Sequence, residues 1–316
     1  MAPEVPELLP SFNSSLTNDP QALPLPLPLP LSAPASSADT GFGSVGYEML
    51  ATAAVCVFAL ISQSGAILGG REAAPHSRPY MASIQKVVGG GRSHECGGFL
   101  VREQWVMTAV HCFPQGASNK KVVLGMHSVS EAEDTQQVFD IMELHTNPNY
   151  RTHNFDNDIA LIKLDRPANI TSAVQVVRFL RAGGTNPSTD QAADTAGWGA
   201  SDNLGSRPDK LKELTVEVVN PMLCARSDYF GSRYTNNMLC AHHVYNQPGS
   251  KWPKKEDTCD GDSGGPLLVD GVVVGIVSNG GIKCGQLRKP GIYTVVSHYT
   301  EWLDGIMGSQ PTAAPQ

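Results

Sequence analysis

Three short segments contain side chains that could cooperate in nucleophilic catalysis. TAVHC contains His111, DNDIALI contains Asp158 at the start of an apolar run, and DTCDGDSGGP contains Ser263 among glycines. A serine hydroxyl is a weak nucleophile unless a base removes its proton, and the base needs a carboxylate that orients it. The three side-chain types are therefore those that catalysis by serine requires.

Each of these side chains alone also has an ordinary structural explanation. A single histidine is usually structural, and an aspartate at the start of a strand is usually a cap or turn residue. The serine segment is more informative, because Gly261, Gly264 and Gly265 allow backbone amides to converge near one hydroxyl. A developing oxyanion needs preorganised donors of this kind.

The sequence after residue 67 indicates strands that would position these segments. Short apolar runs recur between clusters of Gly, Pro, Asn and Asp, as in 122–126, 158–164 and 211–219. In 267–277, Asp270-Gly271 separates two β-branched runs, which is a strong hairpin signal. The segment 295–307 has helical spacing, with apolar residues along one face. Many short strands and one terminal helix predict an all-β domain of barrels or sandwiches.

Charge and composition favour a globular protein without a nucleic-acid partner. The chain has 316 residues, 41% of them hydrophobic, and a formal net charge of -7. Residues 1–66 contain five acids and no Lys or Arg, so the remainder holds 25 acidic against 23 basic side chains. No basic stripe is present, and the short cluster Lys251–Lys255 is expected to be a solvated loop.

The first 66 residues are expected to lie outside the folded domain. Proline at every second position of Leu23–Leu31 prevents both helix and sheet, so 1–48 is expected to be a disordered, Pro-rich upstream extension. The apolar run 49–61 is too short to span a bilayer and fits a signal peptide or short propeptide over 49–66, with small residues before a cleavage site after Ala66. Translation is then expected to start at Met49. The alternative for this run is a buried helix.

The cysteines support secretion. Of seven cysteines, Cys56 lies in the apolar run and would be removed with it. An even number in a secreted chain predicts disulfides, although six cysteines allow about 15 pairings. No CxxC motif is present, so zinc is not expected. The six that remain are Cys96, Cys112, Cys224, Cys240, Cys259 and Cys284. Asn169 begins an N-I-T triplet and is a candidate glycosylation site.

Five motifs in chain order resemble the chymotrypsin-type serine proteases: ILGG, TAVHC, DNDIALIKL, GWG and GDSGGP. The similarity extends from residue 67 to about 307. It implies two antiparallel six-stranded barrels with a boundary near residue 183, a C-terminal helix, a flexible tail at 308–316, and an active site in the cleft between the barrels. By this resemblance His111 is the general base, Asp158 orients it and Ser263 is the nucleophile, while the amides of Gly261 and Ser263 form the oxyanion hole.

The resemblance also implies activation by proteolysis, as in a zymogen. A new α-amino group at Ile67 would fold inward and pair with Asp262, next to the nucleophile. Many relatives have Arg or Lys before this bond, but here it is Ala66. Either signal peptidase cuts directly after Ala66, or it cuts earlier and a dipeptidase removes Gly65-Ala66. Control by a tryptic activator is not expected.

The family pattern implies disulfides Cys96–Cys112, Cys224–Cys240 and Cys259–Cys284. Many relatives have one further bridge, whose two positions here are Ala193 and Val269, so both partners are missing together. A calcium ligand of trypsins is replaced by Met126. No cofactor and no metal site are therefore expected.

Specificity follows from further positions of the resemblance. Asp257 matches the base of the primary pocket of trypsin-like members, where a carboxylate attracts Arg or Lys. Gly280 and Gly291 match its walls, and Ser278 matches the residue that supports the substrate backbone. A surface-loop role is the alternative for Asp257.

Three departures modify this expectation. Relatives usually have Trp where Asn279 stands, and losing that aromatic wall should weaken peptide binding. Lys283, near the pocket rim, could pair with Asp257 and block it in the resting state. Asp260 adds a negative charge at the pocket mouth.

Within the family, the motifs point to two subgroups, complement factor D and the granule proteases. REAAPHSRPYMASIQ (71–85), GSRPDKL (205–211) and LRKPGIYT (287–294) resemble complement factor D, which cleaves factor B after an arginine. VVLGMHSVSEAEDTQQVF (122–139) resembles serine protease 57, and part of it resembles granzyme K. We expect a secreted or granule-stored, arginine-directed endopeptidase of immune type, with factor D slightly favoured. It would be a monomer that acts on protein substrates, complement components among them, with no membrane span.

The alternative class is a catalytically silent binding protein of the azurocidin type, which the complete set of three catalytic side chains disfavours.

Overall fold

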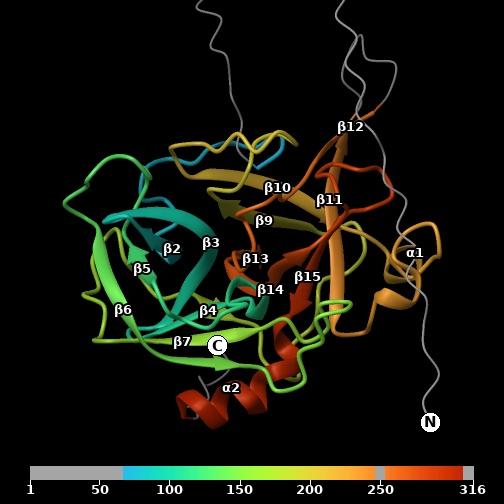
Figure 1. The fold of residues 1–316 in the computed structure, drawn as a ribbon. Helices are drawn as coiled ribbons and strands as arrows, with labels where there is room; N and C mark the ends of the chain where they lie inside the picture. The colour runs from blue at the N-terminus through green and yellow to red at the C-terminus, as the bar shows by residue number, and fades with distance from the viewer. Residues whose placement is uncertain (1–66, 246–252, 309–316) are drawn as a thin grey trace, which may run out of the picture. The chain divides into compact units, whose positions relative to one another are not determined.

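The structure is a computed structural model that describes residues 67–245 and 253–308. The extension 1–48, the segment 49–66 and the tail after Gly308 lie outside the described residues. Within these, no helix is long and apolar enough to cross a membrane. The described chain folds into two closed, antiparallel barrels of six strands each, which confirms the expected fold class (Figure 1).

The first barrel has the strand order β2-β3-β4-β7-β6-β5, and β5 returns to pair with β2. Its strands are β2 (Met81–Val88), β3 (Gly91–Arg102), β4 (Trp105–Thr108), β5 (Lys120–Leu124), β6 (Gln137–Thr146) and β7 (Ala160–Leu164). Ile84, Phe99 and Leu161 are fully buried in its core. Because β4 lies next to β7, Thr108 is paired with Ala160, which brings together the chain segments that follow β4 and precede β7.

The second barrel has the order β10-β9-β13-β14-β15-β11 and is closed by pairing between β10 and β11. Its strands are β9 (Ala192–Gly197), β10 (Lys212–Val218), β11 (Met238–Tyr245), β13 (Pro266–Val269), β14 (Val272–Asn279) and β15 (Gly291–Val295). The last strand of the first barrel ends at Leu164, and the first strand of the second barrel begins at Ala192. The boundary near residue 183 stays a prediction. Figure 1 draws the first barrel in teal and green and the second in yellow to red.

Short elements extend the barrels. They are β1 (Arg71–Glu72), which pairs with β10, β8 (Arg178–Phe179), which pairs with β14, and β12 (Lys254–Glu256), which pairs with β11. The helical elements are α1 (Pro221–Cys224), α2 (Thr300–Met307) and the 3-10 turns η1 (Val110–Cys112), η2 (Gly231–Arg233) and η3 (Val296–Tyr299).

The sequence patterns account for these elements. Strand β10 buries Leu214, Val216 and Val218 and exposes the residues between them, as alternation predicts. The predicted hairpin is formed by β13 and β14, and both turn residues, Asp270 and Gly271, have positive φ as a tight primed turn requires. The predicted terminal helix comprises η3 and α2.

Candidate active site

His111 and Asp158 meet where β4 and β7 lie side by side. His111 is in η1, just after β4, and Asp158 is two residues before β7. The ring Nδ1 of His111 lies 2.6 Å from Oδ2 of Asp158, and the backbone N–H of His111 donates to Oδ1 at 3.0 Å. Asp158 is fully buried, while His111 keeps part of its ring exposed. The carboxylate therefore holds His111 by one contact to the ring and one to the backbone, and neither contact uses the ring Nε2.

The second barrel holds the same carboxylate from the other side. Ser278 donates its hydroxyl hydrogen to Oδ2 of Asp158 at 2.7 Å, and Thr294 donates to the backbone oxygen of Asp158 at 3.0 Å. Ser278 lies near the end of strand β14 and Thr294 lies in β15. The orientation of His111 therefore depends on contacts from both barrels.

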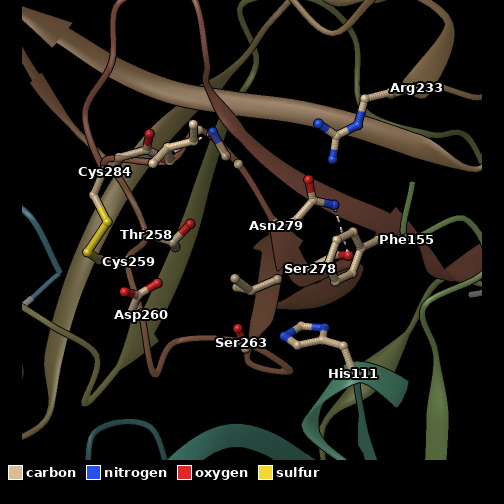
Figure 2. Close-up of a pocket in the computed structure, with 16 residues that line it drawn as sticks. His111, Phe155, Arg233, Thr258, Cys259, Asp260, Ser263, Ser278, Asn279 and Cys284 are labelled. Atoms are coloured by element: carbon tan, nitrogen blue, oxygen red, sulfur yellow. Dashed lines mark hydrogen bonds between the residues drawn. A yellow bond between two sulfur atoms is a disulfide. The ribbon is translucent and has the colours of Figure 1, made fainter. Parts of the chain in front are cut away.

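Ser263 lies in the loop before β13 and is drawn beside the His111 ring in Figure 2. Its backbone oxygen accepts a hydrogen bond from Gly97 of β3 at 2.8 Å, which ties the loop to the first barrel. Gly264 has φ +82°, and a Cβ there would lie 2.2 Å from Oγ1 of Thr108. Glycine is required at that position by both backbone conformation and space.

The directions of the Gly261 and Ser263 N–H groups follow from the hydrogen bonds that the carbonyls of the same peptide planes accept. The carbonyl of Asp260, which shares a peptide plane with the Gly261 N–H, accepts from Ala200 at 2.7 Å. The carbonyl that shares a plane with the Ser263 N–H accepts from Gly265 at 2.9 Å. Since N–H and C=O of a trans peptide point in opposite directions, both N–H groups point away from these bonds. Within 67–245 and 253–308 neither donates to a protein acceptor, so both are available to an oxyanion.

Asp262 is fully buried behind the serine loop. Its two oxygens accept from the backbone N–H groups of Gly199 at 2.8 Å and Cys259 at 2.9 Å. Burial raises the pKa of Asp262 to about 7, although these two hydrogen bonds lower it. A cation beside this carboxylate would offset part of the cost of burying its charge.

The segment that begins at Ile67 is docked next to the loop of Asp262. Ile67 is fully buried, and the carbonyl of Leu68 accepts from the backbone N–H of Asp257 at 3.2 Å. A Cβ on Gly285 would lie 2.4 Å from Leu68, so the segment is tightly packed. The residue expected to become the new terminus therefore already lies in the interior.

A cavity of about 310 Å³ opens beside His111 and Ser263. Its lining includes the sequence-predicted residues Asp257, Ser278, Gly280 and Gly291. Asp257 is only 2% exposed, and its Oδ1 accepts from the N–H of Gly291 at 3.1 Å. A Cβ on Gly291 would lie 2.8 Å from that same oxygen, so the glycine lets the wall approach the carboxylate closely. The structure thus brings the predicted pocket residues into one cavity with His111 and Ser263.

The pairing of Lys283 with Asp257 is not formed in the structure. Lys283 is exposed and lies in the chain between Ile282 and Cys284, which line the cavity. Among the described residues, the ammonium group within ion-pairing distance of Asp257 is that of Lys255, 3.4 Å away. The expectation that Lys255 belongs to a solvated loop is wrong, because strand β12 turns its side chain into the protein, where 1% of it is exposed. A run of lysines gave no sign that one of them is buried.

Two residues at the site, Phe155 and Arg233, were not identified from the sequence. The ring of Phe155 packs edge-on against His111, with centroids 5.5 Å apart (Figure 2). Arg233 also lines the cavity, and Figure 2 shows its guanidinium group reaching toward Asn279. Asn279 donates to the hydroxyl of Ser278 at 3.3 Å. The one feature of the sequence that could have indicated Phe155 is its position three residues before Asp158.

The three expected disulfides are present: Cys96–Cys112, Cys224–Cys240 and Cys259–Cys284. The first lies directly beside His111, and the third links the serine loop to the segment after Gly280. Asn169 lies on an exposed segment, and its glycosylation stays a prediction.

Comparison with known proteins agrees with this geometry. Residues 67–303 match the family model described as Trypsin. Granzyme M of Rattus norvegicus is 35% identical over 77% of this chain and 89% of its own length. Serine protease 57 of Homo sapiens is 38% identical over 79% and 84%, respectively. Among solved structures, neuropsin, described as a serine protease of mouse brain, is 34% identical with a TM-score of 0.64, and the match covers 76% of this chain and 100% of that one. The chain is therefore a serine endopeptidase and belongs to the trypsin family.

Proposed function

We propose that His111, Asp158 and Ser263 form the catalytic triad of an endopeptidase that cleaves after Arg or Lys. The observation that carries this proposal is the common cavity that holds His111, Ser263 and the buried carboxylate of Asp257. The first two supply the nucleophile and its base, and the third supplies a counter-charge for a basic side chain.

The reaction proceeds in two stages. Nε2 of His111 takes the proton of Ser263 while Oγ attacks the carbonyl carbon of the peptide. The oxygen becomes an anion held by the N–H groups of Gly261 and Ser263, and the protonated ring then gives its proton to the leaving amine. Water, deprotonated by the same ring, hydrolyses the acyl-enzyme. Asp158 keeps the ring oriented and stabilises its charged form.

Activity depends on cleavage before Ile67. The freed ammonium group would pair with Asp262. Burial disfavours the charged form of this carboxyl group, and a cation beside it would favour that form. This pair would stabilise the backbone between Asp260 and Ser263, which carries the oxyanion donors. The buried position of Ile67 supports this proposal.

We place the enzyme in the secretory pathway, released outside the cell or stored in leukocyte granules. The similarity to granzyme M, chymase and serine protease 57 supports the granule setting. The motifs that resemble factor D keep complement factor B as a candidate substrate. An extracellular role and a granule role would both use cleavage after a basic residue, so the substrates of the enzyme have to be profiled before one role is chosen.

Profiling with a peptide library tests the proposal. Protein that begins at Ile67 should cleave after Arg or Lys, and Ser263→Ala protein should cleave nothing. Purified factor B is a second arm, in which a single cut after an arginine would favour the complement role. Cleavage only after aromatic or aliphatic residues would overturn the pocket assignment. No cleavage by correctly folded protein would favour a silent binding protein.

A further inference from the structure

A buried lysine lies against the base of the specificity pocket. Nζ of Lys255 is 3.4 Å from Oδ2 of Asp257, and the two side chains are 1% and 3% exposed. The same ammonium group donates to the backbone oxygen of Gln286 at 2.7 Å. Pairing of β12 with β11, with Val244 opposite Lys255, holds the lysine in this place.

The lysine reaches the carboxylate from outside the cavity. Asp257 lines the cavity that His111 and Ser263 share, whereas Lys255 is not part of that lining. The carboxylate is thus open to a substrate side chain on one side and is balanced by a resident cation on the other. Burial raises the pKa of Asp257 and lowers that of Lys255, and the attraction between the two groups opposes both shifts.

A resident counter-ion changes what the pocket can recognise. A substrate cation about 4 Å from Asp257 and about 7 Å from Lys255 would lose roughly half of its attraction to repulsion, since Coulomb energy varies inversely with distance. Directional hydrogen bonds to the carboxylate are not cancelled in this way. A guanidinium can make two such bonds, but an ammonium acts mainly as a point charge.

We propose that Lys255 is a specificity-determining residue that neutralises Asp257 from behind. The pocket then selects side chains by hydrogen bonding and length more than by charge. It prefers arginine to lysine, and it accepts citrulline, the uncharged analogue of arginine, nearly as well as arginine itself. This inference rests on the proposed role of Asp257 as the base of the pocket.

The test compares substrates that differ only in the residue before the cleaved bond: arginine, citrulline or lysine. Each enzyme begins at Ile67 and is standardised by active-site titration, so misfolded protein does not count. Lys255→Met removes the buried charge at similar length. Lys283→Met is the matched control, because it removes the same charge from the exposed rim. Inhibition by benzamidine, a small aromatic cation, gives a second readout that needs no catalysis.

We expect the arginine-to-citrulline ratio of kcat/KM to rise at least about five-fold in Lys255→Met, and lysine cleavage to increase more than arginine cleavage. Benzamidine should bind correspondingly more tightly, while Lys283→Met leaves the ratio within about two-fold of wild type. A smaller rise in Lys255→Met, or an equal rise in Lys283→Met, overturns the inference.

Two safeguards keep the test decisive. Removing Lys255 leaves a buried carboxylate unpaired, which can prevent folding. If the variant does not fold, the test uses the ratio of kcat/KM for arginine and citrulline substrates in the wild-type enzyme. A preference for arginine above about 100-fold overturns the inference. Failure of the proposed function looks different, because the titrated wild-type enzyme would then cleave none of the three substrates.

Discussion

Asp257 donates its backbone N–H to the carbonyl oxygen of Leu68 at 3.2 Å, so the proposed base of the specificity pocket is hydrogen-bonded to the segment that follows Ile67. On the other side of this segment, a Cβ on Gly69 would lie 2.4 Å from the side chain of Glu256. The start of the protease domain therefore packs directly against β12 and the pocket. This hydrogen bond is the direct contact through which a shift of the Ile67 segment would reach Asp257.

Enzyme that begins at Ile67 should lose activity at alkaline pH. An unperturbed α-amino group titrates near ~8, and pairing with buried Asp262 raises that pKa. The stabilisation is complete below the unperturbed pKa and is lost as the pH rises through the raised value. The measurement is kcat/KM against pH on a substrate without titrating groups. Activity that stays constant beyond about pH 11 would contradict the role of the amine.

Blocking the amine should produce a stability difference that depends on pH. Burial raises the pKa of Asp262 to about 7. Without a cation beside it, this group therefore lowers the stability of the fold as the pH rises from the pKa of an aspartate in the unfolded chain toward 7. A free ammonium at Ile67 removes this loss. The Tm of protein that begins at Ile67 should exceed that of protein retaining Gly65-Ala66 by more at pH 7 than at pH 4. An equal gap at both values would show that the two groups do not interact.

The hydrogen bonds to Asp158 predict graded effects on catalysis. Asp158→Asn should lower kcat by about 10⁴, which is the loss that the equivalent change causes in a well-studied member of this family. Ser278→Ala removes one of the bonds to that carboxylate and should cost roughly ten-fold. Both variants should keep the wild-type Tm within a few degrees. If Ser278→Ala reduces kcat as much as Asp158→Asn, the serine has a role in the reaction beyond holding Asp158.

Restoring an aromatic wall should improve peptide binding. By the family resemblance, Asn279 replaces a Trp, and its amide donates to the hydroxyl of Ser278 at 3.3 Å. Asn279→Trp should lower KM for extended peptide substrates about five- to ten-fold through added apolar contact, and should change single-residue esters little. Asn279→Gln serves as the polar control. An equal gain on the esters would show that the effect does not come from the extended substrate.

The residue before Ile67 should decide which enzyme matures the protein. If signal peptidase cuts directly after Ala66, secreted Ala66→Arg protein should keep an N-terminal extension, since small residues are required before that bond. If signal peptidase cuts before Gly65 and a dipeptidase then removes two residues, the variant should still begin at Ile67, because the substitution leaves the earlier cleavage site unchanged. N-terminal sequencing of the secreted variant separates the two routes. Secreted Ala66→Arg protein whose first residue lies after Ile67 would contradict both.

Local patterns in the sequence were sufficient for much of the fold. The Asp270-Gly271 turn, the alternation of β10 and the helical spacing at 295–307 all reflect interactions within one element, and the structure has them as predicted. Closure of the barrels depends on pairing between distant strands. Its prediction came from the family resemblance and not from these patterns.

The site shows the same division. The structure brings His111, Asp158 and Ser263 close together, and their recognisable motifs were enough for them to be identified as candidates for one site. Lys255 was not identified, because a lysine beside other lysines looks like a solvated residue, and only the register of β12 on β11 turns it toward Asp257. Arg233 likewise reaches the cavity through the path of the chain around η2.

The central claim, that Ser263 is a nucleophile activated by His111, is tested most directly by a fluorophosphonate probe. Attack forms a bond between Oγ of Ser263 and phosphorus, fluoride leaves, and the serine proton passes to His111. Mass spectrometry of protein that begins at Ile67 should locate one adduct, on the peptide containing Ser263. In His111→Ala the labelling rate should fall at least about 10³-fold. Labelling elsewhere, or equally fast labelling of Ser263 without His111, would contradict the account.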